Sequence, residues 1–529
     1  MHSRPSLPFL LLFLGVFGAG LGIFTRHNQF EVYCHPDEFG KARQLVRKER
    51  NFNHPMLMLT TVELVDRVVL SREERKDFQT VTVTGRWATA AFGALAAASL
   101  ALLAARQYNL WAGWLTGLLA VGNPLLFELA HYFKEDPWLT AGIALTALAL
   151  HSFQRKPDRT RLCLLAGATA LAAAGKYMGI TLLPMALWAV WRLSTPSADA
   201  GSAPRRRWTA MGLFLLVFAM VWLGLNYWLF KSGSRMWSSV GEEMDKAYGN
   251  SLLSHGAHIL RFYGWLQSHY GGWAVPCLAS LWVLWAVAHP RRIPAAEWLL
   301  AGTSLLYFVI FSLTPKVSER YYLPISVSLC YFAVAGVMVW AQAIPRHRRG
   351  LSIAGLVLAT GLAVGAAGTQ YPALEKTWTG FTFSDRQRLE QWIVGNLPAD
   401  AVIAQDEAVN LPEPDRMSKK HAGRTPLPQR VMGAKKLTEI GTIAQMQAKG
   451  VTHAAICQRI YARYLDGTLD VREGQALEIQ QLYSTLLRKG LIVWEAPRGR
   501  NTHLQPGLSL IDIRGIPADQ RAAPPPLPK

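Results

Sequence analysis

The sequence predicts an all-α polytopic membrane protein with about eleven transmembrane helices, followed by a small C-terminal α/β domain. Two observations predict this fold class. Apolar runs close to the length of a bilayer-spanning helix recur about eleven times, and the composition turns polar near residue 372. The chain is 51% hydrophobic and only 17% charged, a composition that several soluble domains would not explain.

The apolar runs follow one another along the first two thirds of the chain. They lie at residues 7–24, 87–105, 110–130, 138–153, 162–175, 178–192, 209–229, 271–288, 297–313, 321–341 and 351–369. The first run follows Arg4 and ends near the small residues 18–20, so a cleaved signal peptide is an alternative. Because many further runs follow, we interpret it as a retained first span.

The net charge of +20 is explained by topology, because the basic residues recur in every second connection. These residues are Arg4, Arg106, Arg155, Lys156, Arg159, Arg161, Arg205, Arg206, Arg207, Arg291, Arg292, Arg346, Arg348 and Arg349. The positive-inside rule places them in the cytoplasm. The opposite side receives residues 25–86, 131–137, 230–270, 314–320 and everything after about 370. A nucleic-acid partner is not expected, since it would require the bases on one soluble face.

These assignments divide the chain into a transmembrane part, residues 1–371, and a soluble part, residues 372–521, with a disordered tail at 522–529. Charges alternate with apolar residues at helical spacing over residues 37–76, which predicts helices lying in the membrane interface. In the soluble part, strands are expected at 401–404, 454–456 and 491–494, and helices at 384–396, 437–449 and 473–489. We expect this domain outside the cytoplasm, on the outer side of a bacterial plasma membrane.

The cysteines and histidines give no metal-ligand spacing, so neither a metal site nor a cofactor is assigned. A divalent cation is left as an open alternative, with no residues assigned to it. Cys34 and Cys457 would both face an oxidising compartment, and two unpaired thiols are favoured over a bridge between them. The chain also lacks a nucleotide-binding motif in a credible context.

The first candidate site is the pair Asp37 and Glu38, which follows Pro36 directly after the first span. A proline ahead of two acids is typical of a helix N-terminus, so simple stabilisation of the helix end is one explanation. The position at the membrane surface favours a second explanation. A carboxylate there could deprotonate or orient an acceptor hydroxyl.

The second candidate site is the turn 131–137 (His-Tyr-Phe-Lys-Glu-Asp-Pro), on the same predicted side as Asp37. Asp136 ahead of Pro137 could simply cap a helix. However, ionisable groups at membrane depth are costly, so the cluster with Glu135 also indicates a functional site.

The third set is cationic and lies in the other outer turns. Lys176 interrupts an apolar run, and Lys316 and Arg320 flank the next outer turn. Interfacial placement of long basic side chains beside tyrosines would explain each one alone. Cations in every short outer turn run against the positive-inside bias, and they suit the binding of a lipid phosphate. Acids that activate a nucleophile and cations that stabilise a departing phosphate form a coherent set.

These motifs resemble the GT-C superfamily of membrane glycosyltransferases, in the branch of dolichyl-phosphate-mannose protein mannosyltransferases and lipid A aminoarabinose transferases. The resemblance rests on Asp37 and Glu38 and on the segments 52–57 (Phe-Asn-His-Pro-Met-Leu), 134–139 (Lys-Glu-Asp-Pro-Trp-Leu), 174–177 (Ala-Gly-Lys-Tyr) and 316–324 (Lys-Val-Ser-Glu-Arg-Tyr-Tyr-Leu-Pro). Met56 and Ala174 depart from the usual Pro and Thr of the family.

The resemblance implies a polyprenyl-phosphate-linked sugar donor, inverting transfer and a protein, lipid or envelope-glycan acceptor outside the cytoplasm. It assigns catalysis to Asp37 as base, supported by Glu38 and Asp136. It assigns substrate binding to Glu135, Lys176, Tyr177, Lys316, Arg320, Tyr321 and His54. A multi-span transporter or flippase is the alternative, disfavoured because internal duplication and charges within spans are both scarce.

Overall fold

The computed structural model describes residues 7–31, 34–194, 203–232, 236–239, 241–242, 264, 272–313, 318–343, 349–382, 384–413, 425–466, 474–499 and 503–517. Lys316, the tail 522–529 and most of the loop 230–270 lie outside the described residues. The chain forms two compact units. Unit 1 comprises residues 1–32 and 36–375, and unit 2 comprises residues 33–35 and 376–529.

Unit 1 is a helical bundle, and every apolar run predicted from the sequence coincides with a helix or with two consecutive helices. The α-helices are α1 (Leu7–Phe24), α2 (Pro36–Val46), α3 (Leu57–Val69), α4 (Phe78–Gln107), α5 (Leu110–Val121), α6 (Pro124–Ala130), α7 (Asp136–Arg155), α8 (Arg159–Gly175), α9 (Leu182–Leu193), α10 (Ala203–Leu225), α11 (Leu229–Ser232), α14 (Ala274–Ala288), α15 (Ala295–Leu313), α16 (Leu323–Ala343) and α17 (Arg349–Thr382). Short 3₁₀ turns are η2 (Glu74–Lys76), η3 (Tyr177–Thr181), η4 (Pro290–Arg292) and η5 (Glu319–Tyr322). Helix α17 continues across the boundary between the units.

The predicted number of eleven spans is not confirmed. Among the described residues, five helices are long and apolar enough to cross a membrane, and a bent pair raises the number to six. Helices α9 and α14 have only 12 and 15 residues. At about 1.5 Å per residue, α9 is shorter than a hydrocarbon core of about 30 Å.

The third predicted span, 110–130, is the bent pair. Helices α5 and α6 meet at an angle of 62°. The side chain of Asn123 accepts a hydrogen bond from the Leu126 amide, and Pro124 occupies the first turn of α6. A capping side chain followed by proline starts a new helix, which explains the break that hydrophobicity alone does not indicate.

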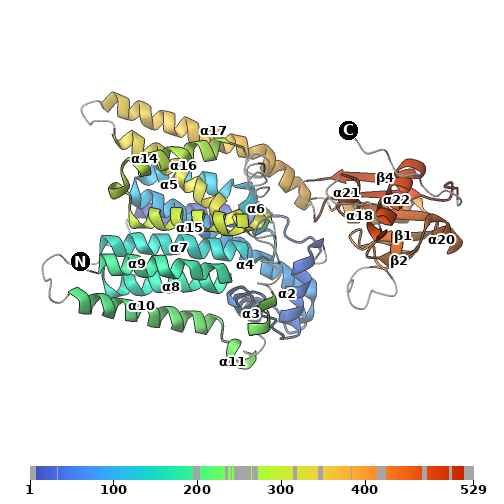
Figure 1. Ribbon diagram of the computed structural model, residues 1–529, viewed down its shortest axis with the longest axis horizontal. Helices are drawn as coiled ribbons and strands as arrows, with labels where there is room; N and C mark the ends of the chain where they lie inside the picture. The colour runs from blue at the N-terminus through green and yellow to red at the C-terminus, as the bar shows by residue number, and fades with distance from the viewer. Residues whose placement is uncertain are drawn as a thin grey trace. The chain divides into compact units, whose positions relative to one another are not determined.

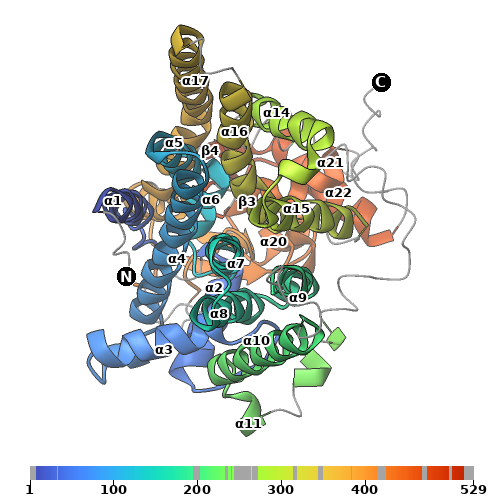
Figure 2. The same cartoon turned by 90° about the vertical axis from the view of Figure 1, so that its left-hand side faces the viewer.

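Helix α7 lies inside the bundle. Figure 2 shows it among α4, α8, α9, α15 and α16. Small residues allow this packing: Gly142 of α7 lies directly against the backbone of Ala172 in α8. Helices α2 and α3 gather at the end of the bundle where α7 begins (Figure 1). The first residue of α7, Asp136, therefore lies at the same end of the bundle as α2 and α3.

Helices α2 and α3 correspond to the interfacial helices expected within residues 37–76. Along α3, Leu64, Val68 and Val69 are exposed, Val68 to 85%. Apolar side chains on the surface of a short amphipathic helix suit contact with lipid, so the interfacial placement stays a prediction that this face supports.

Unit 2 is a five-stranded α/β domain with strand order β2-β1-β3-β5-β4. Its strands are β1 (Val402–Asp406), β2 (Arg430–Ala434), β3 (His453–Cys457), β4 (Leu491–Arg498) and β5 (Pro506–Asp512). Strands β1, β2 and β3 run parallel, and β5 pairs antiparallel with both β3 and β4. The helices are α18 (Asp385–Asn396), α20 (Ile443–Ala448), α21 (Gln458–Leu465) and α22 (Gly474–Lys489), with the 3₁₀ turn η8 (Leu437–Glu439).

The sheet of unit 2 is covered on both faces because its side chains alternate. Ala404 and Ile511 pack with Tyr483 of α22 on one face, whereas Ile403 and Leu510 pack with α18 on the other. The predicted strands and the helices at 384–396 and 473–489 are present, whereas the predicted helix at 437–449 is divided into η8 and α20. Elements β2, β5 and α21 were not predicted. Cys34 and Cys457 are both buried, and no disulfide joins them.

Candidate active site

The acidic pair at the start of α2 is divided between two environments. Helix α2 begins at Pro36, so Asp37 and Glu38 occupy its first turn. Successive residues of a helix point about 100° apart. The Asp37 side chain is 43% exposed, whereas the Glu38 side chain is fully buried.

Glu38 is held by Arg86 of α4 in a buried, two-point ion pair. Arg86 donates from Nε to Oε1 at 2.9 Å and from Nη2 to Oε2 at 2.7 Å. The Phe133 amide donates to Glu38 Oε1 at 2.7 Å. Glu38 does not line the cavity described below. Its predicted part in catalysis is untested, and these contacts favour a positioning role.

The turn 131–136 between α6 and α7 contributes three charges. Lys134 is buried and forms an ion pair with Asp37. Glu135 occupies the N-cap position of α7 without a capping hydrogen bond. Asp136 does not cap the helix, because it is the first helical residue and its Oδ1 lies 2.6 Å from the Nζ of Lys176.

The cations of the other turns converge on one aromatic ring. Lys176 Nζ lies 4.7 Å and the Arg320 guanidinium carbon 5.5 Å from the centre of the Tyr321 ring. Arg320 Nη1 also donates to Asp37 Oδ2 at 3.0 Å. Lys316, the third predicted cation, lies outside the described residues.

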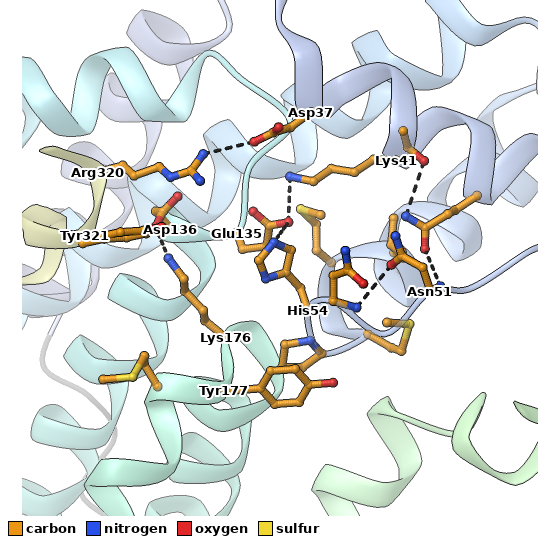
Figure 3. A pocket seen from close by; sticks show the side chains of 18 of the residues that line it. Asp37, Lys41, Asn51, His54, Glu135, Asp136, Lys176, Tyr177, Arg320 and Tyr321 are labelled. Atoms are coloured by element: carbon orange, nitrogen blue, oxygen red, sulfur yellow. Dashed lines mark hydrogen bonds and ion pairs between the residues drawn. The ribbon is translucent and has the colours of Figure 1, made fainter. Parts of the chain in front are cut away.

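These side chains border one cavity of about 650 Å³ in unit 1. Figure 3 shows the charged groups around it. The predicted site residues that line it are Asp37, His54, Glu135, Asp136, Lys176, Tyr177, Arg320 and Tyr321. Apolar residues on its wall are Met178, Ile180, Ile310 and Phe311. Residues that are far apart in sequence and predicted on one side of the membrane thus share one cavity.

The cavity keeps its carboxylates ionised. Burial alone would raise the pKa of Asp37, but the charges of Lys134, Lys41 and Arg320 lower it below its ordinary value. Burial likewise opposes ionisation of Glu135, whose pKa is lowered by His54, Lys41 and Lys134.

The basic groups are affected in the opposite sense. Burial lowers the pKa of Lys134 to about 8, helped by Lys41 and Arg320 and opposed by Glu135 and Asp37. For His54, burial and the neighbouring lysines lower the pKa to about 4, against the attraction of Glu135. The imidazole keeps 35% of its surface accessible because it borders the cavity, although the surrounding protein withdraws it from bulk water. His54 is therefore neutral at pH 7.

The loop 47–56 forms the other wall of the cavity and is fixed at several points. The Tyr177 hydroxyl donates to the Phe52 carbonyl at 2.9 Å, and the Met56 amide donates to Asn226 Oδ1 at 2.8 Å. Phe52 has a positive φ of 53°, a strained backbone conformation that persists only when its surroundings hold it. This loop brings Asn53 and His54 to the cavity beside Glu135.

Two functional side chains escaped the sequence reasoning. Lys41 forms an ion pair with Glu135 at 2.7 Å and donates to the Phe133 carbonyl at 2.8 Å. It follows Asp37 by four residues, a spacing that places both on one helix face. Arg86 opens the apolar run of α4, and a charge at that position is itself a signal. Within the described residues, no group of three or more His, Cys, Asp or Glu side chains could hold a metal ion.

A family model supplies the deciding comparison. The model for dolichyl-phosphate-mannose-protein mannosyltransferases matches residues 68–231. The predicted resemblance to the GT-C glycosyltransferases is confirmed. The matched range contains Asp136 and Lys176, whereas Asp37 and Arg320 lie outside it. No curated protein sequence matches the chain.

Comparison with solved structures finds three glycosyltransferases with different degrees of similarity. AglB, the archaeal oligosaccharyltransferase from Archaeoglobus fulgidus, solved with an inhibitory peptide and a dolichol-phosphate, is 10% identical with a TM-score of 0.50, covering 85% of this chain and 70% of its own. ArnT from Cupriavidus metallidurans in the apo state is 16% identical over 96% of this chain and 98% of its own, with a TM-score of 0.49. The S. cerevisiae protein O-mannosyltransferase Pmt1-Pmt2 complex, bound to the sugar donor, is 18% identical over 44% of this chain and 35% of its own, with a TM-score of 0.37. At 10% identity the likeness to AglB concerns the fold alone.

Proposed function

We propose that this protein is an integral-membrane glycosyltransferase that moves a sugar from a polyprenyl-phosphate donor to an acceptor hydroxyl, with inversion at the anomeric carbon. The acceptor would be a protein, a lipid or a cell-envelope glycan on the outer side of a bacterial plasma membrane. The observation that carries the proposal is the single cavity in which accessible Asp37 lies beside Arg320, Lys176 and an apolar wall.

The charge of the cavity suits a phosphodiester. Three carboxylates, of Asp37, Glu135 and Asp136, are opposed by four cations, of Lys41, Lys134, Lys176 and Arg320. With His54 neutral, one positive charge remains. A polyprenyl-phosphate sugar carries one negative charge at its phosphodiester, so its binding would balance the site.

Tyr321 indicates where the phosphate would bind. Lys176 and Arg320 both lie against its ring, so an anion at the edge of the ring could contact both cations. The neighbouring Ile310 and Phe311 give the donor's isoprenoid end an apolar wall. A phosphate is a weakly basic leaving group, so cations can stabilise its departure without a general acid.

Asp37 is the base that the geometry favours. Its side chain is 43% exposed, whereas Asp136 is buried and paired with Lys176. The Asp37 carboxylate would take the proton of the acceptor hydroxyl as that oxygen attacks the anomeric carbon. Glu38 and Asp136 would support Asp37 by fixing the first turn of α2 and the position of Lys176.

The test is transfer by the purified full-length chain in lipid nanodiscs, supplied with radiolabelled polyprenyl-phosphate sugars, mannose first, and with peptide, lipid and glycan acceptors. Asp37→Asn should lower kcat by roughly 10²- to 10⁴-fold, the usual contribution of a general base. The matched control is Asp77→Asn, because Asp77 lies in the same predicted outer segment and only caps α4.

The two possible failures have different meanings. If the unsubstituted protein transfers sugar from no lipid donor while carrying solute across the membrane, the transporter alternative replaces the proposal. If transfer occurs and Asp37→Asn matches Asp77→Asn, the enzyme stands but the assignment of its base is wrong.

A further inference from the structure

The Asp37 carboxylate is held by two cations that differ in their access to the cavity. Lys134 is buried, with 2% of its side chain exposed, and does not line the cavity. Arg320 lines the cavity and keeps 26% of its side chain exposed. Both contact the same carboxylate oxygen, Oδ2. A substrate in the cavity can therefore reach Arg320 but not Lys134.

This arrangement is unfavourable for a base. Burial would raise the pKa of Asp37, yet Lys134, Lys41 and Arg320 together lower it below its ordinary value. A carboxylate stabilised in this way has little tendency to accept the proton of a hydroxyl. The ion pairs thus hold Asp37 at the cavity with its basicity suppressed.

Arg320 has hydrogen-bonding capacity for a second anion. A guanidinium has five N–H donors, and Nη1 is the one directed at Asp37. The buried Nε of Arg320 has no hydrogen-bond partner in the part of the chain that the structure describes. Lys176, the other cation at the Tyr321 ring, already points into the same region (Figure 3).

We propose that Arg320 is shared between Asp37 and the donor phosphate, so that donor binding itself removes one of the two cations paired with Asp37 and favours its action as the base. This inference rests on the proposed function. An arriving phosphodiester draws the guanidinium toward its own oxygens, where two parallel N–H donors can bind it. Lys134, which the donor cannot reach, keeps Asp37 in place.

The reaction then proceeds with its charges balanced. The acceptor hydroxyl gives its proton to the Asp37 carboxylate and forms a bond to the anomeric carbon. The bond from that carbon to the phosphate oxygen breaks, and its electron pair leaves on the phosphate. The charge of the lipid phosphate rises from one to two negative, next to Arg320 and Lys176. When the lipid phosphate departs, Asp37 loses its proton to water and Arg320 returns to it.

The first experiment observes Asp37 directly in the full-length protein in nanodiscs. The protein is labelled with ¹³C at aspartate carboxyls, and infrared difference spectra are recorded on adding polyprenyl phosphate without sugar. Asp37→Asn identifies the band. We expect polyprenyl phosphate to shift the infrared band of the Asp37 carboxylate. In the Arg320→Gln variant, the band should already lie at the shifted frequency before any lipid is added.

The outcomes separate the two proposals. Binding of polyprenyl phosphate with an unchanged Asp37 band overturns the sharing of Arg320 and leaves the proposed function standing. An Arg320→Gln spectrum like that of the unsubstituted protein also overturns it. Failure to bind polyprenyl phosphate contradicts both.

The second experiment measures kinetics as a function of pH. It includes Arg320→Lys, which keeps the positive charge and perturbs the fold less, in case Arg320→Gln folds poorly. The acidic limb of kcat reports the base with donor bound, whereas that of kcat/KM for the donor reports the free enzyme. We expect the acidic limb of kcat to lie at a higher pH than that of kcat/KM in the unsubstituted protein. The pH difference between the acidic limbs of kcat and kcat/KM should be smaller in Arg320→Gln. Coincident limbs in the unsubstituted protein would overturn the inference, since a merely structural Arg320 moves neither limb.

Discussion

Glu38 follows Asp37 directly, yet its carboxylate belongs to the framework of unit 1. Arg86 of α4 connects this helix to α2 and to the segment that follows α1. It pairs with Glu38 and also donates to the Asn28 carbonyl at 2.8 Å. Removing one partner of a fully buried ion pair leaves an uncompensated charge, whereas replacing both by apolar groups is often tolerated.

Arg86→Met should therefore lower the free energy of unfolding by about 3–5 kcal/mol. The double substitution Glu38→Met with Arg86→Met should recover most of that loss. Thermal unfolding in detergent, compared across the single and double variants, measures both. Equal destabilisation in the single and double variants would show that the loss in Arg86→Met does not come from leaving Glu38 unpaired.

His54 gives a prediction about pH. Its pKa of about 4 keeps it neutral across the physiological range, so it can only donate or accept hydrogen bonds there. His54→Gln should raise KM by roughly tenfold, the value of one hydrogen bond, and leave the limbs of the pH–activity profile in place. Loss of a limb between about pH 5.5 and 7.5 in the variant would instead assign acid–base chemistry to the imidazole.

At the scale of elements, the close packing of α7 and α8 depends on Gly142. A Cβ at this position would come within 2.4 Å of the Ala172 Cα, so alanine would force the two helices apart. Gly142→Ala should cost about 1–3 kcal/mol of stability, as overpacking usually does. Gly167→Ala is the matched control, because a Cβ there meets nothing within 4 Å. Thermal unfolding of both variants tests this, and equal melting temperatures would contradict it.

Some elements of the fold can be predicted from the sequence alone, and others cannot. Apolar runs indicate the helices of unit 1, and the alternation of basic connections places Asp37, Asp136 and Arg320 on one predicted side. The break at Asn123 depends on one capping side chain within an apolar run. Mean hydropathy over a window as long as a membrane span does not detect a single polar residue. Strand β5 begins at Pro506 and contains Gly507 with a φ of 73°, so local propensity opposes a strand that pairing with β3 and β4 stabilises.

Lys41 and Arg86 show why the site could be anticipated only in outline. The residues that carry chemistry have recognisable types in recognisable turns. The side chains that neutralise them depend on which face of α2 or α4 turns inward, and this is decided by tertiary packing.

At the scale of the whole molecule, unit 2 carries its own response to pH. Asp406 is completely buried, and burial raises its pKa to about 7, against hydrogen bonds from the Tyr483 hydroxyl and the Cys457 and Leu437 amides. The folded unit therefore retains a proton that the unfolded chain loses near pH 4. Stability falls as the pH rises from about 4 to about 7, with a slope of at most about 1.4 kcal/mol per pH unit.

Asp406→Asn should remove that slope, while Asp400→Asn, an exposed neighbour, should keep it. Hydrogen exchange of the β1 and β3 amides in the full-length protein, corrected for the intrinsic effect of pH, gives the measurement. Protection that is independent of pH in the unsubstituted protein would show that Asp406 does not retain its proton.

The bend between α5 and α6 precedes the turn 131–136, which lies alongside α4 instead of beyond its end. A Cβ at Gly85 would lie 2.6 Å from the Phe133 ring, so the turn carrying Lys134 to Asp136 is level with the eighth residue of α4. The preceding part of α4 therefore rises about 10 Å above the turn. In the proposed reaction, an extended peptide, a single sugar or a lipid headgroup would reach a turn set below the end of its neighbouring helix more readily than the broad surface of a folded globular partner would.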